Sequence, residues 1–341
     1  MNEFSAFIAR YKKVIQSEIV KSIKLLPDTH PQFAEEYQLF SQSAQGGKTI
    51  RGTLVQLGYL LGNLVEDKEL VKISAACEIL HVSLLIHDDI IDRSELRRGK
   101  PTIHKALGRG HYGISQAICL GDMGLFLATK LISESKISNV LKTKVIAFFS
   151  QMVMDTIAGE MLDIKISLSG YHKKMSDIML MQQLKTASYT IVGPLIIGAM
   201  VGRANKKQLR ATKKFGEYIG MAFQIQDDIL GVFGDERIVG KSVRSDIEEN
   251  KSTLLIMHAL TKATPKQRKI LDSYYGTGKI TVKQHERIKQ IFETTGALAY
   301  SQSKVEEYIT AGKKFIPAMT ENKKIQDILM QFVDFILQRK K

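Results

Sequence analysis

The sequence predicts an all-α protein, and three observations support this prediction. Apolar residues recur at helical spacing nearly everywhere in the 341 residues, as at Leu54, Leu57 and Leu61. Period-two alternation, which is typical of half-buried strands, is not sustained in any long window. No linker rich in proline, glycine or serine separates two parts of the chain, so we expect a single domain over residues 1–341.

Seven breaks are expected to separate the helices, and each contains proline, glycine or both. Proline cannot donate the helical hydrogen bond, and glycine costs conformational entropy inside a helix. The segments between consecutive breaks are therefore expected to be helices of ordinary to long length. In chain order the breaks are Leu26-Pro27-Asp28, Gly46-Gly47, Gly99-Lys100-Pro101, Ser169-Gly170, Gly234 to Gly240, Thr264-Pro265 and Gly276-Thr277-Gly278.

The composition indicates a packed protein with excess positive charge. Hydrophobic residues make up 44% and charged residues 25%, with only six prolines, which argues against long disordered stretches. The formal net charge of +14 and the pI near 9.5 favour anionic partners. Nucleic acid, acidic lipid and phosphorylated small molecules all remain open on this evidence.

The chain is expected to stay in the cytoplasm. Cys77 and Cys119 lie in apolar helical patterns without metal-ligand spacing, so neither a disulfide nor a zinc site is expected. Residues 1–17 lack the continuous apolar core of a signal peptide. The longest apolar stretch, Ile191 to Val201, falls short of the about 18 residues that a membrane-spanning helix needs, so no transmembrane helix is expected.

One internal similarity guides the functional interpretation. The sequence LIHDDII at residues 85–91 is similar to QIQDDIL at residues 224–230. Each segment is a helical pattern that ends in paired aspartates. We expect the two helices to face one another across a cavity and to share a cluster of cations.

The first acidic motif contains Asp88, Asp89 and Asp92. Asp88 and Asp92 are four residues apart and therefore lie on one helix face, near a helix C-terminus where the helix dipole disfavours anions. A solvated acidic helix end is the alternative. Mg²⁺ would compensate this charge, because it accepts one or two carboxylates and keeps room for water and phosphates. Arg97 and Arg98 follow closely and match phosphate oxygens.

Two further elements contain charges that suit phosphate. Asp227 and Asp228 are followed by Lys241 and Lys251, which could also be plain surface lysines. A glycine turn at residues 45–51, QGGKTIR, opens a helix with two cations near its start, where backbone N–H groups favour an anion. This turn lacks the spacing of a P-loop and follows no strand, which disfavours nucleoside triphosphate binding.

Together these elements resemble the trans-polyprenyl diphosphate synthases, which include farnesyl and geranylgeranyl diphosphate synthases. The resemblance covers roughly residues 45–253, the motif-bearing core. It implies a single helical bundle of the isoprenoid synthase type with a central active-site cavity, and a homodimer. It also implies condensation of isopentenyl diphosphate with dimethylallyl, geranyl or farnesyl diphosphate, with release of pyrophosphate and with Mg²⁺, three ions per site when substrate is bound.

The resemblance assigns roles residue by residue. The catalytic set is Asp88, Asp89, Asp92, Lys185, Asp227 and Asp228, of which Asp88, Asp92 and Asp227 hold the metal. Isopentenyl diphosphate is expected at Lys48, Arg51, His81 and Arg98. The allylic diphosphate is expected at Arg97, Lys185, Thr186, Gln224, Lys241 and Lys251. The departing pyrophosphate is the expected base, so no Ser/His/Asp triad is required.

This sequence departs from the family pattern at two places. The second motif usually reads Asp-Asp-x-x-Asp, whereas Gly231 takes the last position here. The metal could then rely on Asp227 with water. The glycine motif usually continues Arg-Pro, whereas Gly52 follows Arg51 here, which puts local rigidity at the helix start in doubt.

The growing product is expected to run along the helix of the first motif, with a floor one or two turns before Asp88. The floor residues would be Leu80, Ser83 and Leu84. Ser83 is small and blocks little, which favours a product of at least geranylgeranyl length and leaves longer chains open. Phe126, on a neighbouring helix, is a candidate for closing the tunnel.

Several rival functions are weaker. A class I terpene cyclase shares the first motif but needs no isopentenyl site, and a non-catalytic subunit of a heteromeric synthase would be expected to lose one aspartate pair. His87-Asp88 suggests an HD-type phosphohydrolase, but the other histidines are poorly placed for a two-metal centre. Nucleic-acid binding depends on net charge alone. The basic C-terminal helix, residues 325–341, is expected to pack into the core, and at most a peripheral membrane contact is the alternative.

Overall fold

The computed structural model describes residues 3–26, 30–63, 69–108, 110–168, 174–236 and 242–337. The chain forms two compact units. Unit 1 contains residues 1–151, 193–212 and 318–331, and unit 2 contains residues 152–192, 213–317 and 332–341. The expectation of a single domain over the whole chain stays a prediction.

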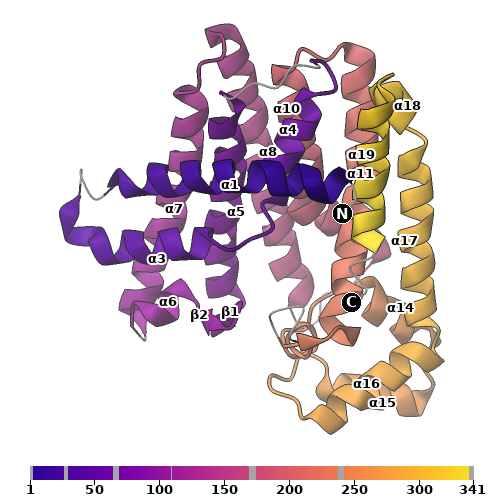
Figure 1. Cartoon of the computed structure of the whole chain (residues 1–341). Helices are drawn as coiled ribbons and strands as arrows, with labels where there is room; N and C mark the ends of the chain where they lie inside the picture. The colour runs from indigo at the N-terminus through magenta and orange to yellow at the C-terminus, as the bar shows by residue number, and fades with distance from the viewer. Residues whose placement is uncertain are drawn as a thin grey trace. The chain divides into compact units, whose positions relative to one another are not determined.

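Unit 1 is built from helices and one short hairpin (Figure 1). α5 packs most extensively against α7, and α4 packs against α10. Its elements are α1 (Glu3–Lys24), η1 (Pro31–Phe33), α3 (Ala34–Ala44), α4 (Ile50–Tyr59), α5 (Leu70–Ile91), β1 (Leu96–Arg97), β2 (Lys100–Pro101), α6 (Ile103–Ala106), α7 (His111–Ser133) and α10 (Gly193–Val201).

Among the described residues of unit 2, the regular elements are all helices. Its elements are α9 (Met175–Gln182), the π-helix η2 (Gln183–Val192), α13 (Ser245–Glu248), α14 (Leu254–Lys262), α15 (Pro265–Tyr274), α16 (Val282–Thr294) and α17 (Ala297–Lys313). Four further helices contribute residues to both units: α8 (Asn139–Ser167), α11 (Lys206–Phe233), α18 (Ile316–Met319) and α19 (Lys323–Leu337).

Several expected breaks are confirmed. α4 begins at Ile50 after the glycine pair, and α15 ends at Tyr274 before Gly276. α15 begins at Pro265, where Thr264 and Gln267 form a capping box that satisfies the helix N-terminus. The breaks at residues 27–28 and 169–170, and most of the one at 234–240, lie outside the described residues.

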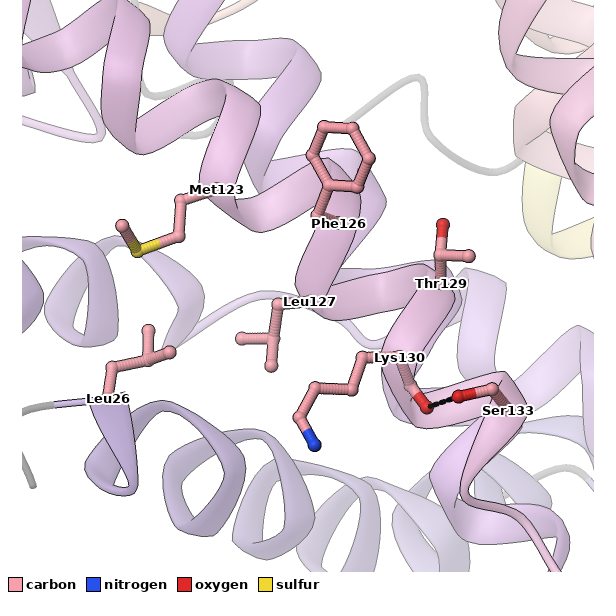
Figure 2. A pocket seen from close by; sticks show the side chains of 7 residues that line it. All are labelled: Leu26, Met123, Phe126, Leu127, Thr129, Lys130 and Ser133. Carbon is pink, nitrogen blue, oxygen red and sulfur yellow. Dashed lines mark hydrogen bonds between the residues drawn. The ribbon is translucent and has the colours of Figure 1, made fainter. Parts of the chain in front are cut away.

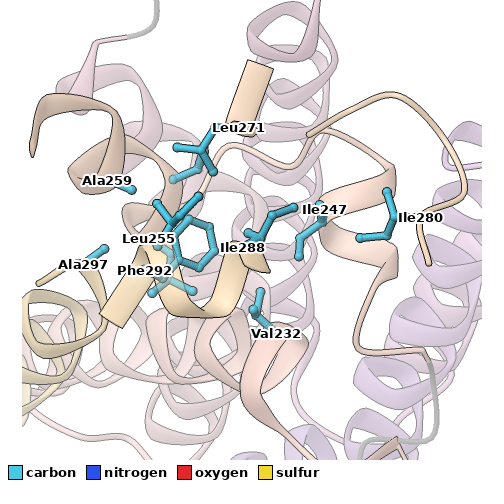
Figure 3. Close-up of a cluster of buried hydrophobic side chains, with 11 residues drawn as sticks. Val232, Ile247, Leu255, Ala259, Leu271, Ile280, Ile288, Phe292 and Ala297 are labelled. Carbon is cyan, nitrogen blue, oxygen red and sulfur yellow. The ribbon is translucent and has the colours of Figure 1, made fainter. Parts of the chain in front are cut away.

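The sequence pattern explains the burial of α5. Residues 73–80 are buried without interruption, and all but Ser74 and Glu78 are apolar, as expected for a central helix that is covered on every side. In unit 2 the core is a cluster of buried side chains drawn in Figure 3. It comprises Val232, Ile247, Leu255, Ile256, Ala259, Leu271, Ile280, Ile288, Ile291, Phe292 and Ala297.

Four stretches of helix are long and apolar enough to cross a membrane, judged by length and composition alone. They are Leu70–Ile91, His111–Ser133, Asn139–Ser167 and Met175–Val201. The apolar windows of the first and the last are 61% and 67% buried inside the protein, which accounts for their composition by core packing. The absence of a membrane-spanning helix stays a prediction.

Candidate functional site

The first acidic motif ends α5, as the sequence predicts. Asp88 and Asp89 lie in the last turn, and Asp92 is the C-cap residue. Asp89 is buried, and Arg97 donates from Nε to both of its carboxylate oxygens, at 2.8 and 2.9 Å. A second Arg97 nitrogen lies 3.3 Å from Asp88 Oδ2. Asp89 therefore holds Arg97 against the motif, while the Asp88 carboxylate keeps partial exposure.

This arrangement keeps the Arg97 guanidinium charged. Burial alone would lower the pKa of Arg97, but the hydrogen bond with Asp89 and the charges of Asp88 and Asp92 raise it. A terminal nitrogen of Arg97 also lies 2.6 Å from Asp89 Oδ1, so two nitrogens contact the carboxylate and fix the plane of the guanidinium as well as its charge.

A short hairpin places the two arginines, and the sequence analysis did not foresee it. β1 pairs antiparallel with β2, with Leu96 opposite Pro101 and Arg97 opposite Lys100. The turn residues Arg98 and Gly99 have φ values of 54° and 74°. Positive φ at both central residues is typical of a tight hairpin turn that matches strand twist, and it is uncommon for a non-glycine residue.

Arg98 reaches the glycine turn that the sequence analysis also selected. Its guanidinium donates to the Gln45 carbonyl oxygen at 3.3 Å. A side-chain carbon at Gly47 would lie 3.5 Å from the same guanidinium. Two consecutive arginines thus serve two segments: Arg97 binds the acidic motif, and Arg98 binds the turn that precedes α4.

The cations Arg51 and Arg98 lie near a buried acid, Glu78, that the sequence analysis missed. Glu78, on α5, accepts a hydrogen bond of 2.8 Å from the Gly52 N–H at the start of α4. Burial raises the pKa of Glu78, while the charge of Arg51 and the backbone N–H groups of Gly52 and Arg51 lower it. The signal was present in the sequence as a lone carboxylate in an apolar helix, one turn before His81.

His81 lies among these cations. Burial lowers its pKa well below the usual range, and the charges of Arg51, Arg97 and Arg98 lower it further. A neutral imidazole adds no positive charge, so His81 can offer a phosphate one hydrogen bond only.

The expected product floor is closely packed. Ser83 is fully buried, and its hydroxyl donates to the Ile79 carbonyl oxygen at 2.9 Å. A Cβ atom added at Gly124 of α7 would lie 2.0 Å from Ser83 Oγ, so the serine faces α7 at close range. Leu80 is buried, and Leu84 is half-buried.

Phe126 lies elsewhere. It is two residues from Gly124 on α7 and therefore points to the opposite side of the helix. Its side chain is 76% exposed and lines an apolar pocket of about 450 Å³ (Figure 2). The other lining residues are Leu26, Met123, Leu127, Thr129, Lys130 and Ser133. Phe126 is therefore not placed to close a tunnel beside Ser83.

In unit 2, Lys185 lies between two acids that the sequence analysis missed. Its ammonium is 2.7 Å from Glu160 Oε2 and 2.7 Å from Asp163 Oδ2, both on α8. Lys185 lies in η2, and π-helical turns are rare and frequent at functional sites. The spacing of Glu160 and Asp163, three residues apart on one helix face, was a signal that the sequence contained. The neighbouring Thr186 is half-buried.

The second acidic motif contains a buried carboxylate, that of Asp228. Asp228 accepts hydrogen bonds from the side-chain amides of Gln182 and Gln224, each at 2.6 Å. Burial raises the pKa of Asp228 well above its usual range, and the charges of Asp246 and Asp227 raise it further. Gln224, predicted to contact the allylic diphosphate, therefore contacts Asp228 in this structure, and Asp227 beside it is half-buried.

Lys251 lies near two other carboxylates of this region. Its ammonium is 3.1 Å from Glu249 Oε2 and 3.6 Å from Asp246 Oδ1. Tyr275 donates from its hydroxyl to the Lys251 carbonyl oxygen at 2.6 Å, which ties this backbone segment to the end of α15. Lys241, the other lysine predicted here, lies outside the described residues.

The carboxylates of the first motif fit a metal ion whose coordination shell is completed by substrate phosphate and water. In the part of the chain that the structure describes, no three His, Cys, Asp or Glu side chains form a ready-made metal centre. Mg²⁺ needs only one or two protein carboxylates when water and phosphate complete its shell, and Asp88 and Asp92 on one face can supply them.

Comparison with known proteins agrees with the prediction from the motifs. The family described as polyprenyl synthetase matches residues 35–295. The chain is 32% identical to the short chain isoprenyl diphosphate synthase of Methanocaldococcus jannaschii, covering 84% of this chain and 83% of that protein. It is 32% identical to the geranylfarnesyl diphosphate synthase of Aeropyrum pernix, covering 87% of this chain and 91% of that protein.

A solved structure agrees as well. Geranylgeranyl pyrophosphate synthase from Corynebacterium glutamicum, in complex with isoprenyl diphosphate and magnesium, superposes with a TM-score of 0.91 at 26% identity. The match covers 97% of this chain and 99% of that one. The all-α fold class of the isoprenoid synthase type is thereby confirmed.

Proposed function

The chain belongs to the polyprenyl synthetase family of prenyltransferases, and we propose that it condenses isopentenyl diphosphate with an allylic diphosphate. The primer is dimethylallyl, geranyl or farnesyl diphosphate, and the product is a trans-polyprenyl diphosphate of geranylgeranyl length or longer. The match to residues 35–295 supports this reaction class.

One observation carries the proposal. The neighbouring arginines Arg97 and Arg98 connect an acidic motif to a basic turn within unit 1. Diphosphate chemistry needs both features, since carboxylates recruit a divalent cation and arginines bind the phosphate oxygens directly. A terpene cyclase, which uses a single diphosphate, gives no reason for the second, basic half.

The basic half would hold isopentenyl diphosphate. Lys48, Arg51 and Arg98 supply positive charge, and neutral His81 supplies a hydrogen bond. Glu78 fixes the start of α4 next to Arg51 through the Gly52 N–H. The binding groups are therefore oriented before substrate arrives, which lowers the entropy lost on binding.

The acidic half would hold the allylic diphosphate together with the metal. Asp88 and Asp92 are the proposed ligands in unit 1, and Asp227 is the proposed ligand in unit 2. When bound, Mg²⁺ would neutralise the diphosphate and make it a better leaving group. We propose three ions per site with substrate bound.

Side chains of the protein stabilise the leaving group, and the substrates supply the remaining reacting groups. Arg97 and Lys185 stabilise the charge that develops on the leaving diphosphate, each already oriented by its own carboxylates. The bond between the allylic carbon and the diphosphate oxygen breaks, and the isopentenyl double bond attacks that carbon. A proton then leaves the new prenyl unit to the departing pyrophosphate, so no protein base is needed.

We also propose that the enzyme is a cytoplasmic homodimer. On α8, Met154, Ile157, Met161 and Ile164 are spaced three, four and three residues apart and are between 43% and 67% exposed. That spacing forms one continuous apolar stripe, which a second copy could cover. Met161→Glu should yield monomers in sedimentation equilibrium, whereas Val282→Glu, at another exposed apolar position, should not.

The reaction is tested by product analysis. The purified protein is incubated with Mg²⁺, labelled isopentenyl diphosphate and each of the three primers in turn, and dephosphorylated products are separated by chromatography. A ladder that ends at a defined length of 20 carbons or more supports the proposal. Cyclised hydrocarbon without use of isopentenyl diphosphate would favour a cyclase, and no elongation from any primer would favour a non-catalytic subunit.

A further inference from the structure

The last position of the second acidic motif has no side chain, and another residue fills its space. Gly231 is four residues after Asp227 on α11, where a related motif would carry its third aspartate. A Cβ atom at Gly231 would lie 2.0 Å from Asp246 Oδ2 and 2.9 Å from Asp246 Cγ. No side chain can occupy position 231 while the Asp246 carboxylate remains in place.

The Asp246 carboxylate is held in that position from the other side. Asp246 belongs to α13 and is 3% exposed. Its Oδ1 atom is 3.6 Å from the Lys251 ammonium, while Oδ2 is the atom nearest to Gly231. The two oxygens therefore face different neighbours, and the one next to α11 lies where the side chain of an aspartate at position 231 would begin.

A second observation indicates that something beyond the described protein atoms completes this region. Gln182 is 2% exposed and donates to Asp228 from its side-chain nitrogen. Among the described residues, its side-chain oxygen is buried without a hydrogen-bond partner. A buried acceptor beside a carboxylate is satisfied by water, and a hydrated divalent cation would bring water there.

We propose that Asp246 supplies the third carboxylate of the second acidic motif, in the place of residue 231. The species bound at this motif is a hydrated divalent cation, which binds together with the allylic diphosphate. This inference depends on the proposed function, because the cation is the one that accompanies that substrate. Asp227 and Asp228 come from one helix, whereas the third acid comes from a segment that follows it in the chain.

Because a side chain at position 231 and the Asp246 carboxylate exclude one another, the inference can be tested by transferring the carboxylate from position 246 to position 231. Asp246→Asn keeps the size of the side chain and removes its charge. Gly231→Asp combined with Asp246→Ala transfers the acid to α11 and removes the collision. Gly231→Ala combined with Asp246→Ala fills the same space without an acid. Asp272→Asn, at an exposed aspartate of α15, is the matched control for the loss of one negative charge.

Cation binding is measured apart from turnover. Binding of Mn²⁺ is followed by electron paramagnetic resonance in the presence of an unreactive sulfur analogue of farnesyl diphosphate. The rise in melting temperature with Mg²⁺ and the same analogue is the second measurement. Asp246→Asn should weaken cation binding about tenfold to a hundredfold, as loss of a supporting carboxylate does in other metal sites, and Asp272→Asn should leave it unchanged.

The double variants decide between charge and volume. Gly231→Asp with Asp246→Ala should recover most of the lost affinity, and Gly231→Ala with Asp246→Ala should recover none. Parental affinity in Asp246→Asn, or equal affinity in the two double variants, would overturn the inference. Because these measurements need no turnover, they separate it from the proposed function, which fails only if the parent elongates no primer.

Discussion

The hydrogen bond between Gly52 and Glu78 predicts that Gly52→Pro destabilises the folded protein. The family pattern that the sequence resembles predicts proline after Arg51, but proline has no N–H to donate to Glu78. The first hydrogen bond within α4 runs from Thr53 N to Thr49 O, so Gly52→Pro breaks no helical bond. Its cost arises from the contacts of position 52 with α5 and α1.

The magnitude follows from two contacts. A hydrogen bond to a charged group contributes about 1.5–3 kcal/mol, and Gly52→Pro removes it. The added carbon would lie 2.9 Å from the Ser74 carbonyl oxygen and 3.1 Å from Ile15 Cδ1, and such overpacking costs about 1–3 kcal/mol. Proline recovers about 0.4–1 kcal/mol by restricting the unfolded chain. We therefore expect Gly52→Pro to lose about 2–5 kcal/mol of unfolding free energy.

Gly52→Ala is the matched control, because it adds the same carbon and keeps the N–H. Its difference from Gly52→Pro contains the hydrogen bond, the packing of the two further ring carbons of proline and any backbone effect of proline. Glu78→Gln separates the hydrogen bond from the other two, since an amide oxygen accepts only a neutral bond of about 0.5–1.5 kcal/mol. The proline–alanine difference should therefore shrink by about 1 kcal/mol in the Glu78→Gln background.

The assay is urea denaturation at pH 7 of the four single and double variants and the parents, without metal. Unfolding midpoints convert to free energies if the slope is unchanged. Gly52→Pro within about 0.5 kcal/mol of Gly52→Ala in the Glu78 background would refute the reasoning, because the hydrogen bond would then contribute nothing measurable.

Three further predictions concern single residues. Lys185→Met should raise the KM for the allylic diphosphate about tenfold to a hundredfold, the effect of losing one charged hydrogen bond, with an unchanged KM for isopentenyl diphosphate; equal effects on both KM values would contradict this role. The raised pKa of Asp228 means that the folded state binds more protons, so stability contributed by that group is full below about pH 4 and falls as pH rises. Asp228→Asn should therefore gain stability over the parent as pH increases in urea titrations with chelator, and parallel curves would argue against it. Ser83→Phe should shorten the product by at least one isoprene unit and cost about 1–3 kcal/mol because of its contact with Gly124, whereas an unchanged product from a folded variant would remove Ser83 from the floor.

Local chemistry explains which features were predictable. The boundaries at Gly46-Gly47 and Thr264-Pro265 follow from residues that cannot continue a helix, and both are observed. Asp88 and Asp92 share a face because they are four residues apart in one helix, whatever surrounds it. Features of this kind depend on neighbours within a turn or two, so a single sequence contains them in full.

The acidic and basic partners could not be predicted in the same way. Three contacts join residues that lie 15 to 26 positions apart in the chain: Glu78 with Gly52, Lys185 with Glu160, and Asp246 with Gly231. Each contact depends on how one helix packs on another, and spacing within a helix carries no information about that.

By itself, therefore, the sequence determined the helical fold class, the two acidic motifs and the reaction family. The tertiary structure alone decided which carboxylate each arginine and lysine contacts, and which aspartate stands beside Gly231. The physical reason is the range of the interactions. Helical periodicity and capping act over a few residues, whereas charge pairing and steric exclusion act through space between segments that only folding brings together.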